Sequence, residues 1–204
     1  AAVQVAAGAG IVLGANETIG SLAGAGDVTL GTRILTTGGS GASTTHSGVI
    51  TGSGGIVKQG AGTFTLAGAN TYTGLTDVQA GTLALGAADV LADTAPVTVS
   101  GGTFDIAAHN DTVGAVTLAS GTIAGSGGAL TGSSFALQSG TVTAILAGAA
   151  AASKTTAGTV TLSGVNSYAG GTTVTGGSLI VTDASGLGSG AASIDATAAA
   201  ATLD

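Results

Sequence analysis

A short motif that begins with glycine recurs along this chain at a nearly constant interval. Between Gly62 and Leu179 the order glycine, threonine or serine, large apolar residue occurs seven times, with successive glycines 19, 21, 19, 19, 18 and 19 residues apart. A period of this size is typical of a solenoid, in which each repeat forms one coil and stacks on its neighbours. We therefore expect residues 1–204 to form a single solenoid segment. The structural repeat positions are Gly62, Gly81, Gly102, Gly121, Gly140, Gly158 and Gly177.

Within each repeat, apolar and polar residues alternate, as in Val116-Thr117-Leu118. This alternation is typical of a β-strand with one buried and one exposed face. A second large apolar residue lies five positions before the one that follows Gly-Thr, as with Val78 and Leu83. The glycine between them suits a tight corner, because it tolerates backbone angles that other residues avoid. The pattern predicts two strands joined by a corner, followed by a turn region rich in glycine, alanine and serine.

The spacing indicates an all-β fold, a right-handed parallel β-helix with about 19 residues per coil. Glycines interrupt every stretch long enough for a helix. The leucine-rich repeat pattern is missing, and a propeller blade is about twice as long. The repeat is weakest in the first sixty residues, where residues 36–45 have the composition of a loop and His46 receives no role.

Composition excludes several classes of function. Charged residues are 6% of the chain, only three residues are Lys or Arg, and the net charge is −7. Such a chain has no basic surface for nucleic acid or anionic lipid. It has no cysteine, so it forms no disulfide and no thiolate metal site. The longest apolar stretch, residues 144–152, is shorter than the roughly 20 residues that span a membrane.

Two longer segments resemble each other beyond the basic repeat. Residues 58–86 align with residues 154–182 without a gap, and 14 of these 29 positions are identical. We call these segments the first and second cassettes. The shared residues include a lysine, an asparagine and a tyrosine in each cassette: Lys58, Asn70 and Tyr72 in the first, Lys154, Asn166 and Tyr168 in the second.

The cassettes resemble the passenger-associated transport repeat of autotransporters, whose pattern is Lys-x-Gly-x-Gly-x-Leu-x-Leu-x-Gly-x-Asn-Thr-Tyr-x-Gly-x-Thr-x-Val-x-x-Gly-x-Leu. The first cassette departs from it at Phe64, and the second at positions that include Thr156 and Ser167. The resemblance implies a passenger domain of type V secretion, at the cell surface of a Gram-negative bacterium or outside the cell. It also implies export by a C-terminal β-barrel translocator of the same precursor, which this chain does not contain. We expect the chain to be a fragment of such a passenger.

From these features we predict a non-enzymatic structural or adhesive stalk whose cassettes assist folding and export, with a surface or host ligand that the sequence does not identify. We expect Asn70 and Asn166 in turns, using left-handed angles and bonding to their own backbone. Tyr72 and Tyr168 are expected to cover a coil corner, and Lys58 and Lys154 to neutralise nearby Asp residues.

Two groups of acidic residues are considered as catalytic or metal-binding sites, and we interpret both as structural. Asp105, His109 and Asp111 lie close in sequence, but no further ligand is nearby, so we interpret them as solvated turn residues. Asp89 and Asp93 are interpreted as turn residues that bracket a loop before Pro96. We therefore predict no catalytic, cofactor-binding or metal-binding residue, and no cofactor.

Three other functions remain open. A self-associating extracellular filament or matrix protein is compatible with the low charge and the exposed Thr and Ser residues. A flat array of threonines, interrupted at Ala84, Asp105, Ala124 and Ile180, weakly resembles an ice-binding face. An enzyme acting on polysaccharide is less compatible, because it needs converging carboxylates.

Overall fold

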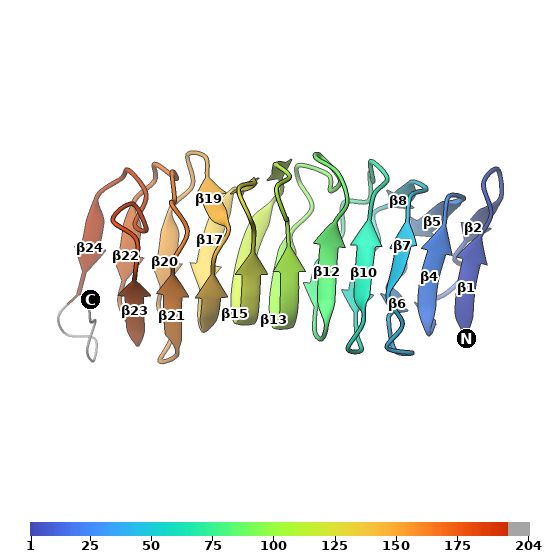
Figure 1. Ribbon diagram of the computed structural model, residues 1–204, viewed down its shortest axis with the longest axis horizontal. Coiled ribbons are helices and arrows are strands. Elements are labelled where there is room, and N and C mark those ends of the chain that lie inside the picture. Colours follow the sequence, from blue (N-terminus) through green and yellow to red (C-terminus); the bar gives the residue numbers. More distant parts are fainter. Residues whose placement is uncertain (196–204) are drawn as a thin grey trace.

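The computed structural model describes residues 1–195 as an elongated stack of coils, with the N-terminus at one end of the rod (Figure 1). Residues 196–204, the last part of the predicted solenoid, lie outside the described residues. All described strand pairs are parallel, and paired residues are between 16 and 22 positions apart in the sequence. The predicted parallel β-helix is confirmed, while its right-handedness stays a prediction. No helix among residues 1–195 is long and apolar enough to cross a membrane.

Each coil has up to three strands, and equivalent strands stack into three faces. Faces 1 and 2 together form the 18-stranded sheet, because the long strands β13 and β15 pass around the corner between them. Face 1 consists of β3 (Glu17–Thr18), β6 (Leu35–Thr37), β9 (Ile56–Lys58), β11 (Thr76–Val78), the first halves of β13 (Val97–Asp105) and β15 (Ala115–Ala124), β17 (Ser134–Leu137), β20 (Ala152–Lys154), β22 (Thr172–Val174) and β24 (Ala192–Ile194).

Face 2 follows face 1 across the glycine corner. It consists of β1 (Ala2–Val5), β4 (Ser21–Gly24), β7 (Thr44–His46), β10 (Thr63–Leu66), β12 (Thr82–Leu85), the second halves of β13 and β15, β18 (Gly140–Val142), β21 (Thr159–Leu162) and β23 (Ser178–Val181).

Face 3 was expected to be only a turn region, and this was wrong for part of the rod. Two small parallel sheets form there, one near the N-terminal end and one near the middle. They consist of β2 (Gly10–Val12), β5 (Asp27–Gly31) and β8 (Ile50–Gly52), and of β14 (Asp111–Thr112), β16 (Ala129–Thr131) and β19 (Ile145–Ala147). The cassettes have no strand on this face, because residues 67–75 and 163–171 are turns and extended segments.

The core is a continuous row of inward side chains along the axis of the rod. The apolar residues on both sides of the corner are buried, as predicted for Val78 and Leu83, and neighbouring coils repeat this arrangement. Inward residues of one coil therefore pack mainly on the coils before and after it, so the stability of each coil depends on its neighbours.

The predicted alignment of the seven repeats holds at every step but one. Thr63 lies beside Thr82, and Thr82 beside Thr103, as expected. The step from Gly140 to Gly158 is different, because Gly140 lies beside Val160 and Thr141 beside Thr161. A shift of two residues keeps the same side chains inside, since strand side chains alternate with a period of two.

The corner glycines are required for two reasons. Gly81 adopts a φ of +62°, and a Cβ atom there would lie 2.3 Å from the carbonyl oxygen of Gly60. Gly62 does not have a positive φ, but a Cβ atom there would lie 2.5 Å from the backbone of the previous coil. Backbone conformation and close stacking of coils both therefore select glycine at this corner.

Two local predictions have different outcomes. Residues 36–45 were expected to form a loop, which was wrong at its ends, because they include parts of β6 and β7. Asp89 and Asp93 are exposed and lie in a strand-free segment before Pro96, in agreement with their interpretation as turn residues.

Candidate functional site

The two cassettes place polar side chains inside the rod, and these side chains form the candidate site. Lys58, Asn70 and Tyr72 in the first cassette are each no more than 4% exposed. Their counterparts Lys154, Asn166 and Tyr168 are equally buried. Buried polar groups need hydrogen-bond partners, so their contacts show what each cassette does.

The lysines bind backbone carbonyl groups and not aspartates, so the prediction that they neutralise Asp was wrong. The Nζ atom of Lys58 donates to the carbonyl oxygens of Gln59, Gly60 and Ala80, at 2.8, 2.9 and 3.0 Å. Ala80 belongs to the following coil, so the ammonium group joins two coils. Burial lowers the pKa of Lys58.

Lys154 repeats this arrangement in the second cassette. Its Nζ atom donates to the carbonyl oxygen of Thr156 in its own coil and to that of Gly176 in the following coil, the latter at 3.0 Å. Burial also lowers the pKa of Lys154. We call each buried lysine with its carbonyl partners a lysine clamp.

The asparagines also join coils, and neither has the expected left-handed backbone. Asn70 accepts a hydrogen bond from the Ile50 amide of the previous coil at 2.9 Å. It donates to the Val90 carbonyl of the following coil at 3.0 Å, as well as to Gly68 in its own turn. Asn70 therefore holds three consecutive coils together.

Asn166 has the same role in the second cassette. Its Oδ1 accepts from the Leu146 amide at 2.8 Å, and its Nδ2 donates to the Gly186 carbonyl at 2.6 Å. Each partner lies 20 residues away, one coil before and one coil after.

The tyrosines lie inside the coil, so the prediction that they cover a corner was wrong. Tyr72 is fully buried, and its hydroxyl group is 2.6 Å from the hydroxyl of Thr76. Burial is the main reason why the pKa of Tyr72 lies above its ordinary value. Tyr168 makes the same contact with Thr172 at 2.6 Å. The rings fill the interior of coils that have no strand on face 3.

The cluster of Asp105, His109 and Asp111 does not form a common site. The Asp105 carboxylate accepts from the amide of Ala107 in a local turn. Asp111 was expected to be solvated, and this was wrong, because it is 2% exposed in β14 and accepts from the amides of Val90 and Leu91. Within residues 1–195, no group of three or more His, Cys, Asp or Glu side chains is arranged to hold a metal ion.

His46 was assigned no role and was expected next to a loop, but it is a fully buried residue of β7. In its stack it lies between Gly24 and Leu66. Burial lowers its pKa, while the backbone of Ala23 and the charge of Asp27 act in the opposite direction.

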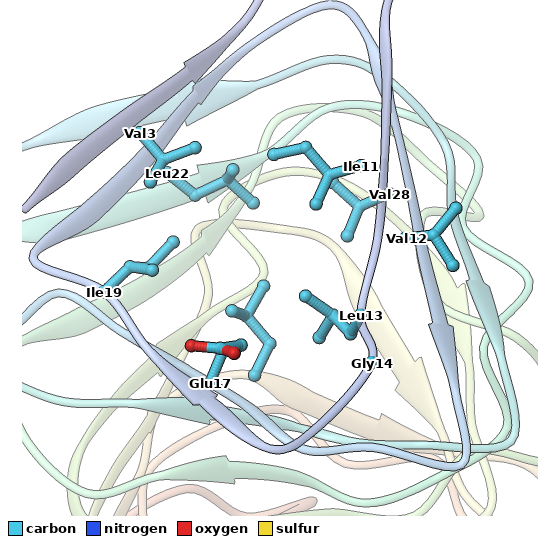
Figure 2. A pocket seen from close by; sticks show the side chains of 10 residues that line it. Val3, Ile11, Val12, Leu13, Gly14, Glu17, Ile19, Leu22 and Val28 are labelled. Atoms are coloured by element: carbon cyan, nitrogen blue, oxygen red, sulfur yellow. The ribbon is translucent and has the colours of Figure 1, made fainter.

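A depression of about 250 Å³ lies at the N-terminal end of the rod (Figure 2). It is lined by apolar side chains of the first two coils, such as Val3 and Ile11 of the first and Leu22 of the second. Glu17 is the charged residue in its lining, so the depression lacks the paired groups that acid–base chemistry requires.

Threonines form a regular row on the outer side of face 2. Six of them stack in consecutive coils: Thr63, Thr82, Thr103, Thr122, Thr141 and Thr161. The row ends at Ile180, as expected from the sequence. The parallel row two residues further along is interrupted by Ala84, Asp105 and Ala124.

Comparisons with known protein families find similarity in the same two segments that we defined as cassettes. The family model described as Passenger-associated-transport-repeat matches residues 56–85 and 153–181. The chain is also 38% identical over 119 residues to "Adhesin BmaC autotransporter" of Brucella suis biovar 1 (strain 1330). The matched region is 57% of this chain and 4% of that relative. No solved structure matches the chain significantly.

Proposed function

We propose that this chain is one section of the adhesive stalk of an autotransporter passenger, because it carries two segments that match the passenger-associated transport repeat and is similar to an autotransporter adhesin. Its site of action is the cell surface of a Gram-negative bacterium or the medium outside the cell. Its role is structural and non-enzymatic: it extends the passenger, and the two cassettes assist folding and export.

The observation that carries this proposal is that the cassette polar groups bond across coil boundaries. Lys58 reaches a carbonyl of the following coil, and Asn70 reaches both neighbouring coils. A buried polar group without a partner costs about 1–3 kcal/mol. Stacking in a wrong register would leave several such groups unpaired, so each cassette favours one register of three consecutive coils.

This selectivity matters for a chain that folds as it emerges from a membrane. Coils of a solenoid stack one after another, and each added coil depends on the one already in place. The second cassette repeats the first after 96 residues. Two register-setting points at this distance limit how far an error in stacking extends. The partner in this process is a C-terminal β-barrel translocator of the same precursor.

The folding and export role is tested by substituting a corner glycine in the full-length precursor. In Gly81→Val and Gly177→Val, the new Cβ atom would lie 2.3 Å from a carbonyl oxygen of the preceding coil, in a backbone with positive φ. Gly39→Val is the matched control, because Gly39 is exposed and a Cβ atom added there would have no neighbouring atom within 4 Å. We expect the first two variants to reduce the surface-exposed passenger and to increase its protease sensitivity.

Normal surface display of Gly81→Val and Gly177→Val, with wild-type protease resistance, would contradict the proposed role. Reduced display of Gly39→Val to the same extent would also contradict it, because that change disturbs no coil contact.

Self-association into a filament is a second candidate, favoured by the outer threonine row. The six stacked threonines carry no charge, and Asp105 is the charged residue in the neighbouring row of this face, so a second copy could approach it with little electrostatic repulsion. Sedimentation velocity of the purified chain distinguishes the two: concentration-dependent assembly supports a filament, and a single monomeric species over the accessible range refutes it. A thermal-hysteresis measurement on the same sample tests the ice-binding alternative.

A further inference from the structure

Three buried polar side chains occupy equivalent positions near the start of face 3. Asn70, Asp111 and Asn166 each accept a hydrogen bond from a backbone amide 20 or 21 residues earlier, in the previous coil. We call these side chains the inner rungs. Two of them belong to the cassettes, while Asp111 lies in the coils between the cassettes.

The two asparagine rungs bond in both directions along the rod. In each, Oδ1 accepts from the previous coil, and Nδ2 donates to a carbonyl of the following coil, Val90 for Asn70 and Gly186 for Asn166. An asparagine supplies both a donor and an acceptor whatever the pH.

Asp111 makes only one half of this pattern. Its Oδ2 atom accepts from the amides of Val90 and Leu91 at 2.9 and 3.1 Å. Its Oδ1 atom is buried and has no hydrogen-bond partner. An ionised carboxylate only accepts hydrogen bonds, whereas a protonated one also has an O–H donor.

We propose that Asp111 is a protonation-dependent inner rung: with its carboxyl group protonated it substitutes for the cassette asparagine, and with the group ionised it loosens the coil junction formed by residues 86–96 and β14. The protonated Oδ1 donates toward the backbone of the following coil, where β16 runs alongside β14. The middle of the rod is therefore tighter in mild acid than at neutral pH.

The surroundings of Asp111 favour the protonated form. Burial is the main cause that raises the pKa of Asp111 to about 6, and the charge of Asp89 adds to it, while the backbone amides of Leu91, Val90 and Thr112 oppose it. The other titratable group that interacts with it is Tyr72, which is neutral in this range. The residues of β16 carry no charge.

The direction of the pH effect follows from the difference in the pKa of Asp111 between the folded and the unfolded chain. The folded chain binds the Asp111 proton more tightly than the unfolded chain, so the contribution to stability is full below pH 3.8 and is lost as the pH rises through about 6. The corresponding change in the local opening equilibrium is at most about 100-fold between pH 4 and pH 8. Protonation of His46 in acid acts in the opposite direction elsewhere in the rod, so the measurement must be local.

The test combines two measurements on the purified 204-residue chain. A carbon NMR titration reports the ionisation of the Asp111 carboxyl directly, assigned by its loss in Asp111→Asn. Hydrogen exchange of the Val90 and Leu91 amides, corrected for the intrinsic pH dependence, reports opening of the junction. We expect titration near pH 6 and opening that increases about tenfold from pH 5 to pH 8 in the wild type, and no such increase in Asp111→Asn.

Asp93→Asn is the matched control, because Asp93 is exposed in the same segment, and it should keep the wild-type pH response. Ionisation of Asp111 below pH 4.5, or the same pH response in Asp111→Asn as in the wild type, overturns the proposal. A failure of Asp111→Asn to fold also counts against it, because an asparagine should serve as a rung at this position. In that case the wild-type titration still decides whether the carboxyl group ionises near pH 6.

Discussion

Replacing Lys58 by methionine removes one lysine clamp while keeping most of the aliphatic side chain. The ammonium group makes three hydrogen bonds of 2.8–3.0 Å to carbonyl oxygens of two coils. In Lys58→Met, these three partly buried carbonyl groups lose their shared donor, and burying methionine avoids the cost of dehydrating a charge. Each carbonyl left without a donor costs about 1–3 kcal/mol, and avoiding the dehydration of a charge offsets part of this cost. The free energy of unfolding should therefore fall by about 3 kcal/mol.

Urea unfolding of the purified chain, followed by circular dichroism at pH 7.5, measures this loss. Arg33→Met is the matched control, because Arg33 is the exposed cation of the chain and its removal should change stability by less than about 0.5 kcal/mol. The second clamp provides a further check. Lys154 lies five coils away, roughly 24 Å at the spacing of β-strands, so the losses in Lys58→Met and Lys154→Met should add.

A loss in Lys58→Met no larger than that in Arg33→Met would refute the reasoning. It would mean that dehydration of the ammonium group cancels its three hydrogen bonds, as happens for some buried ion pairs. The lysine would then select the register without stabilising the fold.

The other predictions concern the remaining buried polar groups. Tyr72→Phe should cost about 1–1.5 kcal/mol, because it leaves the Thr76 hydroxyl without its partner at 2.6 Å, and a double-mutant cycle with Thr76→Val should show that the two losses are not additive. Asn166→Ala should cost about 2–4 kcal/mol and increase hydrogen exchange of the Leu146 amide, and unchanged exchange there would contradict the assignment. His46→Leu should remove one contribution to the pH dependence: since burial lowers the pKa of His46 below 6.5, the stability of the wild type relative to His46→Leu should fall from pH 7.5 to pH 5, and the urea midpoints of both proteins at these two pH values check this.

Local patterns in the sequence were sufficient to predict the coil. The period of the glycine motif, the alternation of apolar and polar residues and the apolar pair around each corner all follow from geometry within one coil. Residues such as Val78 and Leu83 are buried where the alternation placed them. The cassettes were also recognisable, because their identical positions recur at a constant offset.

The roles of the polar residues could not be predicted in the same way. Lysine and aspartate are normally exposed, so Asp111 was expected in a solvated turn, and Lys58 was expected to neutralise nearby aspartates. Each is buried because a neighbouring coil supplies its partners, about 20 residues away in the sequence. The same holds for the two-residue shift at Gly158, which depends on how the preceding coil stacks and not on the motif itself.

By itself, the sequence determined that this chain forms a stack of parallel coils of about 19 residues, because side-chain alternation and corner glycines act within a single coil. Only the tertiary structure decided which polar groups lie inside, how face 3 is built and where the register shifts. These features depend on hydrogen bonds between coils. Almost every residue has a backbone amide and a carbonyl, so the residue type at a position does not reveal which backbone group will form such a bond.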